Sequence, residues 1–420
     1  MTFTISKPKI VLLGLMTRMP VAGVVWQTMH YLVGFQRLGY DVYYVEAHAC
    51  TPSTFIEHEN EDGSDRAADF LAHVMRRFDL GDHWAYQALH ADGQCYGMTE
   101  AQLKQLYRSA ALIINLHGGT IPLPDHYATN RLVYLETDPV ELQMELFENR
   151  QTTIDFLAPH CAFFSFGENF GRPDCLVPLS DRFHFHPTRQ PVVMDFWQSA
   201  TSEPCDTWTT IGNWQQQQHR PIRFNGELYH WSKHYEFLKF LDLPQLSQQT
   251  FELALSSCDE PDQRMLEGKG WRMRSANHLS NDIDAYQKYL FESRGEFTVA
   301  KDQNIRLRSG WFSDRSATYL AAGRPVITQE TGFSNILPTG RGLFGFSTMD
   351  DVLAAVDCVN SDYKAECRAA REIAQEYFDA EVVLGDLLEQ VGLSRRTRTA
   401  PAMIIDVPDQ KLSPLGELPH

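Results

Sequence analysis

The stretch RGEFTVAKDQNIRLRSGWFSDRSATYLAAGRPVITQETGFSN, from Arg294 to Asn335, decides the fold. Within it, GEFTVA predicts a short buried strand, DRSATYLAAG a helix that ends at glycine, RPVIT a second strand, and TGFSN a turn. A strand, a loop, a helix and a second strand in this order make one unit of a parallel sheet. The loop and the helix N-terminus of such a unit lie at the carboxyl edge of the sheet, where anionic ligands bind.

Three polar residues stand at the start of the predicted helix: Asp314, Arg315 and Ser316. Ser316 could cap the helix or donate to an anion, and Arg315 could make a two-pronged contact with phosphate. The alternative is an ordinary helix cap beside a surface arginine.

The order of these elements resembles the donor-binding half of the group-one glycosyltransferases of the GT-B type. The pieces that carry the resemblance are YLAAGRPVI, from Tyr319 to Ile327, and ETGFSN, from Glu330 to Asn335. A weaker resemblance extends over roughly residues 8 to 395. It implies an α/β fold in which two Rossmann-like domains face a central cleft. The second domain would hold a nucleotide-diphosphate sugar, and the first would hold the acceptor.

One departure limits what the resemblance implies. Many retaining members carry two glutamates eight positions apart, and the corresponding positions in this chain are Gly310 and Thr318. Because both glutamates are missing, neither the stereochemistry nor the donor contacts of that subgroup can be carried over. The loop is more similar to a divergent branch of these enzymes.

The first half of the chain opens with a βαβ pattern. The apolar run from Ile10 to Leu15 predicts a buried strand, and a helix is expected from about Val25 to Leu38 before the strand DVYYVEA. Gly23 stands where the backbone must pass close to a ligand or to the opposite domain, so we count it among the donor-binding candidates.

A passage rich in proline, residues 170 to 205, separates the two predicted domains. We expect an N-terminal acceptor domain over residues 1–188 and a C-terminal nucleotide-sugar domain over residues 205–380. By resemblance, a helix over residues 381–395 crosses back to the first domain. Residues 396–420 lack periodicity and are expected to form a mobile tail.

Composition excludes several classes of partner. A chain of 420 residues suits two domains of about two hundred residues each. The net charge of −17 argues against nucleic acid and against an anionic membrane as partners. The eight cysteines lack CxxC spacing, which favours reduced thiols. With no apparent secretory signal and no apolar run of roughly 18 residues, we expect no integral membrane segment and a cytoplasmic location.

The two catalytic candidates follow predicted strands. His117 ends the strand ALIINL and could orient a sugar hydroxyl or its developing charge. Asp302 follows GEFTVA and could hold sugar hydroxyls or act as a base. A hydrogen-bonded loop histidine and a surface Asp302–Lys301 pair are the alternatives.

Basic residues near the same edges are candidates for the diphosphate leaving group, where negative charge grows as the glycosidic bond breaks. By resemblance, Lys233 would share this charge with Arg315, and Lys301 could help. For Lys233 the alternative is a solvated residue on a helix face.

The remaining candidates rest on position. Asn213 ends a predicted strand, and the turn after RPVIT is where related enzymes bind sugar hydroxyls. Asp138, in TDP at a strand end, could bind the acceptor. The donor-binding candidates are therefore Gly23, Asn213, Lys233, Lys301, Asp314, Arg315, Ser316, Glu330, Thr331 and Gly332.

The sequence predicts no metal site and no cofactor, because no DxD stands between hydrophobic strands, the histidines lack ligand spacing and the loop MTRMPVAG is not GxGxxG. The preferred hypothesis is a metal-independent glycosyltransferase, of hexosyl type, with an unidentified acceptor. Two alternatives stay open: a nucleotide-sugar epimerase, and a non-catalytic GT-B module that binds a nucleotide or a partner.

Overall fold

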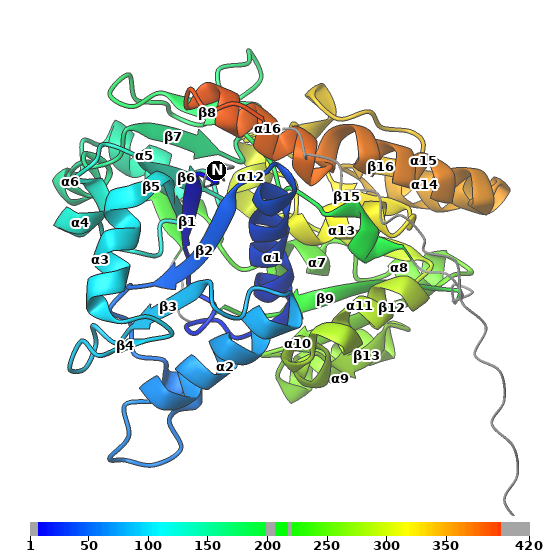
Figure 1. The fold of residues 1–420 in the computed structure, drawn as a ribbon. Coiled ribbons are helices and arrows are strands. Elements are labelled where there is room, and N and C mark those ends of the chain that lie inside the picture. Colours follow the sequence, from blue (N-terminus) through cyan, green and yellow to red (C-terminus); the bar gives the residue numbers. More distant parts are fainter. Residues whose placement is uncertain (1–6, 199–205, 217–220, 396–420) are drawn as a thin grey trace, which may run out of the picture.

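Two β-sheets with helices packed against them form the protein in a computed structural model, which describes residues 7–198, 206–216 and 221–395 (Figure 1). The first sheet has the order β4-β3-β2-β1-β5-β6-β7-β8, parallel except where β4 meets β3. Its strands are β1 (Lys9–Leu13), β2 (Asp41–Glu46), β3 (Trp84–Gln87), β4 (Cys95–Tyr96), β5 (Ala110–Leu116), β6 (Leu132–Glu136), β7 (Ala162–Ser165) and β8 (Phe185–Pro187).

The second sheet is parallel throughout and has the order β13-β12-β9-β14-β15-β16. Its central strands are buried along their whole length, as expected of a parallel sheet covered on both faces, and they bury polar residues such as Glu296 and Thr298. The strands are β9 (Thr207–Asn213), β12 (Thr250–Ser256), β13 (Arg272–Ser275), β14 (Gly295–Thr298), β15 (Val326–Gln329) and β16 (Leu343–Phe346).

Helices connect the strands of the first sheet. The longest of them, α1 (Ala22–Arg37), begins three residues earlier than the sequence predicts and buries most of its length. A capping box between Thr99 and Gln102 starts α3. The other helices of this half are α2 (Ser64–Arg77), α3 (Glu100–Ser109), α4 (Pro124–Tyr127), α5 (Glu141–Phe147) and α6 (Gln151–Leu157), with 3-10 turns at Ser53–Phe55 and Met194–Trp197.

The second half carries the remaining helices. They are α7 (His234–Leu238), α8 (Leu243–Leu246), α9 (Glu260–Gly268), α10 (Asn277–Asn281), α11 (Ile283–Glu292), α12 (Asp302–Arg306), α13 (Asp314–Ala321), α14 (Met349–Ser361), α15 (Tyr363–Ile373) and α16 (Ala380–Gln390), with a 3-10 turn at Phe333–Asn335 and a π-helical turn at Ala374–Phe378. None of the helices in the described part of the chain is long and apolar enough to cross a membrane.

A two-stranded hairpin also belongs to this half: β10 (Ile222–Phe224) and β11 (Glu227–Tyr229). Both residues of its turn, Asn225 and Gly226, have positive φ (50° and 81°). Asn-Gly is the preferred pair for such a two-residue turn.

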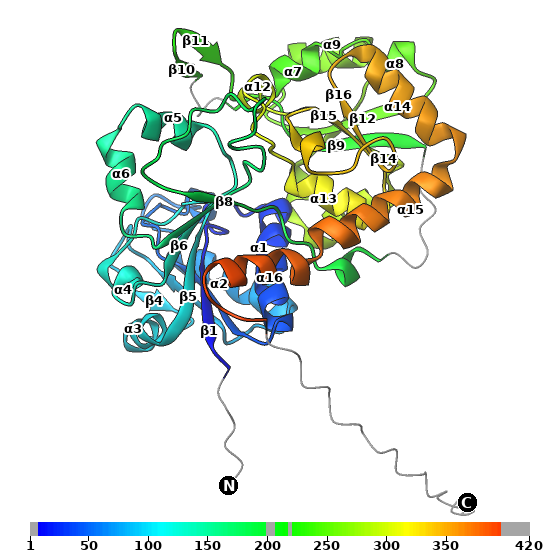
Figure 2. The same ribbon diagram turned by 90° about the horizontal axis from the view of Figure 1, so that it is seen from above.

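Helix α16 lies across α1 although it follows the second sheet in the sequence (Figure 2). The two helices approach closely at Gly34 of α1, where an added Cβ would lie 2.5 Å from Cδ1 of Leu384 and 2.9 Å from Cβ of Ala380. A crossover helix would make this contact. The domain limits 1–188, 205–380 and 381–395 remain our proposal, and the predicted tail over 396–420 lies outside the described residues.

The two halves also share buried apolar residues. Trp26 of α1 belongs to the same core cluster as Tyr286 of α11, and its indole Nε1 donates to the carbonyl of Ile283 (3.0 Å). This contact fixes one side of the junction between the halves.

Candidate functional site

The carboxyl ends of β5 and β6 bring two predicted residues together in the first half. His117 follows β5 with a positive φ of 62°, and its Nδ1 lies 2.7 Å from Oγ1 of Thr137, which follows β6. Asp138 is the next residue. Because both strands are parallel and adjacent, their ends meet at one edge of the sheet.

The second half contributes residues to the same place. The indole Nε1 of Trp311 donates to the carbonyl of Thr137 (3.1 Å), and the Nζ of Lys301 forms an ion pair with the carboxylate of Asp138. The structure therefore joins a predicted donor-binding residue to the predicted acceptor-binding residue. We call the following group the junction site: His117, Thr137, Asp138, Trp231, Lys233, Lys301 and Trp311.

Both lysines of the junction site lie over the face of a tryptophan. The Nζ of Lys233 is 4.9 Å from the ring centroid of Trp311, and the Nζ of Lys301 is 3.5 Å from that of Trp231. Such contacts stabilise an ammonium group without neutralising its charge. Among the described residues Lys233 forms no ion pair, so its charge is available to an anion.

Electrostatics at this place favour the binding of an anion. Burial, followed by the nearby charges of Arg315 and Lys301, lowers the pKa of Lys233 to about 7. Burial also lowers the pKa of Lys301, although Asp138 opposes this shift. A negative ligand would relieve the repulsion between these cations and favour protonation of Lys233.

His117 is neutral at physiological pH. Burial lowers its pKa to about 4, and its ring is oriented by the hydroxyl of Thr137. A neutral imidazole can donate a hydrogen bond to a hydroxyl group or accept one from it, which suits a residue that orients a sugar.

The predicted phosphate pocket at the start of α13 is not formed by its arginine. Arg315 donates to Oε1 of Glu296 (2.6 Å), to the carbonyl of Ile211 (2.6 Å) and to Oγ1 of Thr298 (2.9 Å). This geometry argues against a direct phosphate contact and gives Arg315 a role inside the second half. Ser316 is fully buried and its hydroxyl has no partner among the described residues.

Two further donor-binding candidates lie beside this arginine. Gly23 at the start of α1 and Asp314 line a narrow hollow together with Arg315. The Cβ position of Gly23 is 3.9 Å from the hydroxyl of Tyr286, so Gly23 lies close to the opposite half, as the sequence predicted of its backbone.

Asp302 anchors the hairpin rather than facing the junction site. Its Oδ2 accepts from the backbone N–H of His230 (3.0 Å) and from Arg306 (3.4 Å), and Arg306 also donates to the carbonyl of Leu228 (2.8 Å). This geometry argues against Asp302 as a catalytic residue. Asp302 instead positions the segment from His230 to Lys233, which brings Trp231 and Lys233 into the junction site.

The turn after β15 is filled by neighbouring groups. The carboxylate of Glu330 accepts from the N–H of Gly332 (2.5 Å), and the hydroxyl of Thr331 donates to the carbonyl of Trp311 (2.6 Å). A Cβ at Gly332 would lie 2.7 Å from Nδ2 of Asn169, a residue of the first half. In this arrangement Thr331 supports Trp311, and Gly332 lies against Asn169.

Asn213 lies apart from these contacts at the exposed end of β9, where its side-chain Oδ1 accepts from the hydroxyl of Ser256.

Sequence reasoning missed Trp231, Trp311, Thr137 and Asn169. A signal existed for the tryptophans, since they stand in the segments WSK and SGW beside residues that it did select. No signal in the sequence indicated Asn169. The backbone of Asn169 lies where a side chain at position 310 would point. A Cβ at Gly310 would be 2.3 Å from the nitrogen of Asn169, so the glutamate of the retaining subgroup would not fit here.

Among the described residues no group of three or more His, Cys, Asp or Glu side chains could hold a metal ion. Metal independence stays a prediction.

Comparisons with known proteins agree on the fold. Neither a protein-family model nor a curated protein sequence matches the chain. Among solved structures, a sucrose-phosphate synthase from Thermosynechococcus elongatus is similar, with a TM-score of 0.51 and 11% identity over 92% of this chain and 99% of that chain. HepE of Anabaena, solved with UDP and glucose, has a TM-score of 0.53 and 10% identity over 92% and 99%. AviGT4, a glycosyltransferase involved in avilamycin A biosynthesis, has a TM-score of 0.51 and 12% identity over 91% and 96%.

These similarities extend over nearly the whole of each chain and show that the protein has the GT-B fold of two Rossmann-like domains. The predicted α/β fold class with two Rossmann-like domains is therefore confirmed.

Proposed function

We propose that the protein is a glycosyltransferase that moves a sugar from a nucleotide-diphosphate donor to an acceptor hydroxyl. The observation that carries this proposal is the junction site. There, two lysines held over tryptophan faces lie opposite His117 and Asp138. That arrangement suits a reaction in which negative charge develops on a leaving group between two domains.

In this proposal Lys233 and Lys301 bind the diphosphate. The bond between the anomeric carbon and the diphosphate oxygen breaks, a bond to the acceptor oxygen forms, and the proton of the acceptor hydroxyl is released. The two ammonium groups stabilise the charge left on the diphosphate. The known ligands of a structural neighbour, UDP and glucose in HepE, support a uridine nucleotide as the first donor class to test.

Asp138 and His117 would face the acceptor side. Asp138 is paired with Lys301, so a bound diphosphate would compete with Asp138 for this lysine. Once Asp138 is released from Lys301, its carboxylate could accept a hydrogen bond from the acceptor hydroxyl. Neutral His117 would then orient the sugar. Hexosyl transfer, metal independence and a cytoplasmic location remain parts of this proposal.

A non-catalytic nucleotide-binding module is the second candidate. It is favoured by the turn at Glu330 to Gly332, which is filled by Asn169 where related enzymes hold the donor sugar. A module of this kind would bind the nucleotide and leave the sugar in place.

The test is incubation of the protein with a panel of nucleotide sugars, with analysis of the nucleotide and the sugar afterwards. Release of nucleoside diphosphate with transfer or slow hydrolysis of the sugar supports the proposal. An epimerised donor would indicate a nucleotide-sugar epimerase. Binding without any change in the donor would indicate a non-catalytic nucleotide-binding module.

A further inference from the structure

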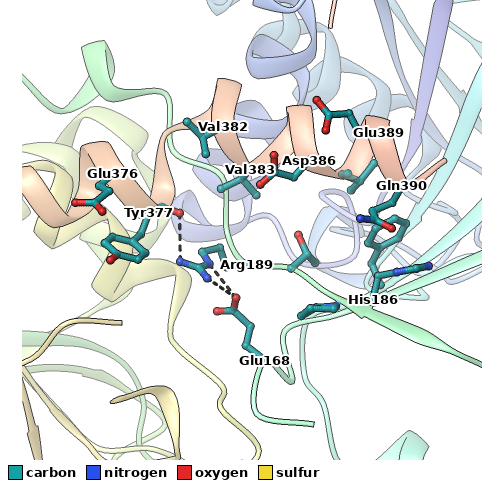
Figure 3. Close-up of a pocket in the computed structure, with 14 residues that line it drawn as sticks. Glu168, His186, Arg189, Glu376, Tyr377, Val382, Val383, Asp386, Glu389 and Gln390 are labelled. Atoms are coloured by element: carbon teal, nitrogen blue, oxygen red, sulfur yellow. Dashed lines mark hydrogen bonds and ion pairs between the residues drawn. The ribbon is translucent and has the colours of Figure 1, made fainter. Parts of the chain in front are cut away.

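A second pocket, of about 520 Å³, lies between strand β8 and helix α16, and none of the junction-site residues lines it (Figure 3). Side chains of α16 form one side. Glu168, His186 and Arg189 of the first half form the other.

The pocket has an apolar part. Val383 and Leu387 of α16 and Phe164 of β7 line it but are buried, and Val382 beside them is 38% exposed. Among the described strands β8 is the last of its sheet, so one of its edges has no neighbouring strand. An open edge beside an apolar surface can accept an added strand.

The charges around the pocket are unbalanced. Four carboxylates line it, and among the described residues two arginines pair with them. Arg189 binds Glu168 (2.6 Å), whereas Arg395 binds both Asp386 (2.6 Å) and Glu389 (3.2 Å). The fourth carboxylate, that of Glu376, is exposed and forms no ion pair among the described residues. Two negative charges are therefore left without a matching cation.

The described chain ends at this wall of the pocket, because Arg395 is its last residue. The sequence continues as RTRTAPAMII, residues 396–405, which we call the tail segment. It contains two arginines, Arg396 and Arg398, and no acidic residue. Its last three residues, Met403 to Ile405, are apolar. Its charge and its apolar end match those of the pocket.

We propose that the tail segment of the same chain docks in this pocket. Arg396 and Arg398 would pair with the acidic side chains, and Met403 to Ile405 would cover the apolar part beside the open edge of β8. The tail segment is long enough to reach along the pocket. Its ten residues span up to about 35 Å when extended, which exceeds the length of about 17 Å of the 11-residue helix α16. Docking would brace α16 against the first half.

Hydrogen exchange of the full-length chain tests this inference. We expect the amides of residues 402–405 to exchange at least tenfold more slowly than in a synthetic peptide of residues 396–407. Charge reversal of the tail (Arg396→Glu with Arg398→Glu) or of the pocket (Glu376→Lys) should abolish this difference. Two matched controls should preserve it: Lys411→Glu, later in the tail, and Glu381→Lys, on α16 but not lining the pocket.

Two results would overturn the proposal. Exchange of residues 402–405 at the rate of the free peptide in the unmodified chain would mean that the tail segment does not dock. Slowed exchange that appears only as the protein concentration rises would place the tail segment in a second copy of the chain instead.

Discussion

Replacing Asp138 with asparagine should strengthen the binding of nucleoside diphosphate. The carboxylate of Asp138 is paired with Lys301, so it competes with a diphosphate for the same ammonium group. Asparagine keeps the size and a hydrogen-bond acceptor but removes the charge. A charged hydrogen bond contributes about 1.5–3 kcal/mol when buried. Because the Asp138 side chain is 34% exposed and solvent screens the pair, we expect a smaller contribution, about 1–2 kcal/mol. That corresponds to binding about 5- to 30-fold tighter.

Calorimetric titration with UDP, GDP and TDP measures this effect, and turnover of the donor should fall in the same variant because the acceptor loses its carboxylate. Asp284→Asn is the matched control, since it removes an exposed ion pair with Arg77 that also joins the two halves. Unchanged or weaker diphosphate binding by the Asp138 variant, with measurable binding by the unmodified chain, would refute the competition.

Three further predictions concern protonation and packing. Diphosphate binding should weaken as pH rises from about 6 to 8, because Lys233, with a pKa of about 7, loses its charge; Lys233→Arg should flatten this profile in titrations at several pH values. Burial raises the pKa of Glu136 to about 8, so the folded state binds more protons than the unfolded state, and the free energy of unfolding should fall between about pH 5 and 8. In urea unfolding, Glu136→Gln should remove that fall, and an unchanged slope would count against the raised pKa. Gly310→Ala should lower the free energy of unfolding by about 1–3 kcal/mol, because φ is +84° and a Cβ would strike Asn169. Gly268→Ala, where a Cβ meets nothing in α9, should leave it equal or higher.

Local sequence patterns predicted much of the fold. RPVIT and GEFTVA became β15 and β14, because short segments with β-branched or aromatic residues between turn residues are recognisable as strands. The helix expected over DRSATYLAAG became α13. The hairpin at Ile222–Tyr229 was missed although its Asn-Gly turn was visible, because the run was short and lay near the start of a half.

The candidate site depended on contacts that no local pattern contains. Lys301 and Asp138 are 163 positions apart, and only the packing of the two halves reveals that they pair. Arg315 was selected correctly as a residue at a helix start, but its guanidinium turns inward to Glu296. The position of a residue in a helix determines where its Cα lies. The residues packed around it in the tertiary structure determine which group its charged end contacts.

The central claim is that the junction site binds a nucleoside diphosphate through Lys233. The most direct measurement is calorimetric titration of the unmodified protein, Lys233→Ala and Lys239→Ala with UDP, GDP and TDP. Lys239 is a matched control, because it lies at the end of the same helix and is 61% exposed. We predict that one nucleotide binds the unmodified chain and Lys239→Ala equally, and that Lys233→Ala loses about 1.5–3 kcal/mol of binding free energy. Equal affinity in all three proteins, or no binding of any nucleotide to the unmodified chain, would contradict the account.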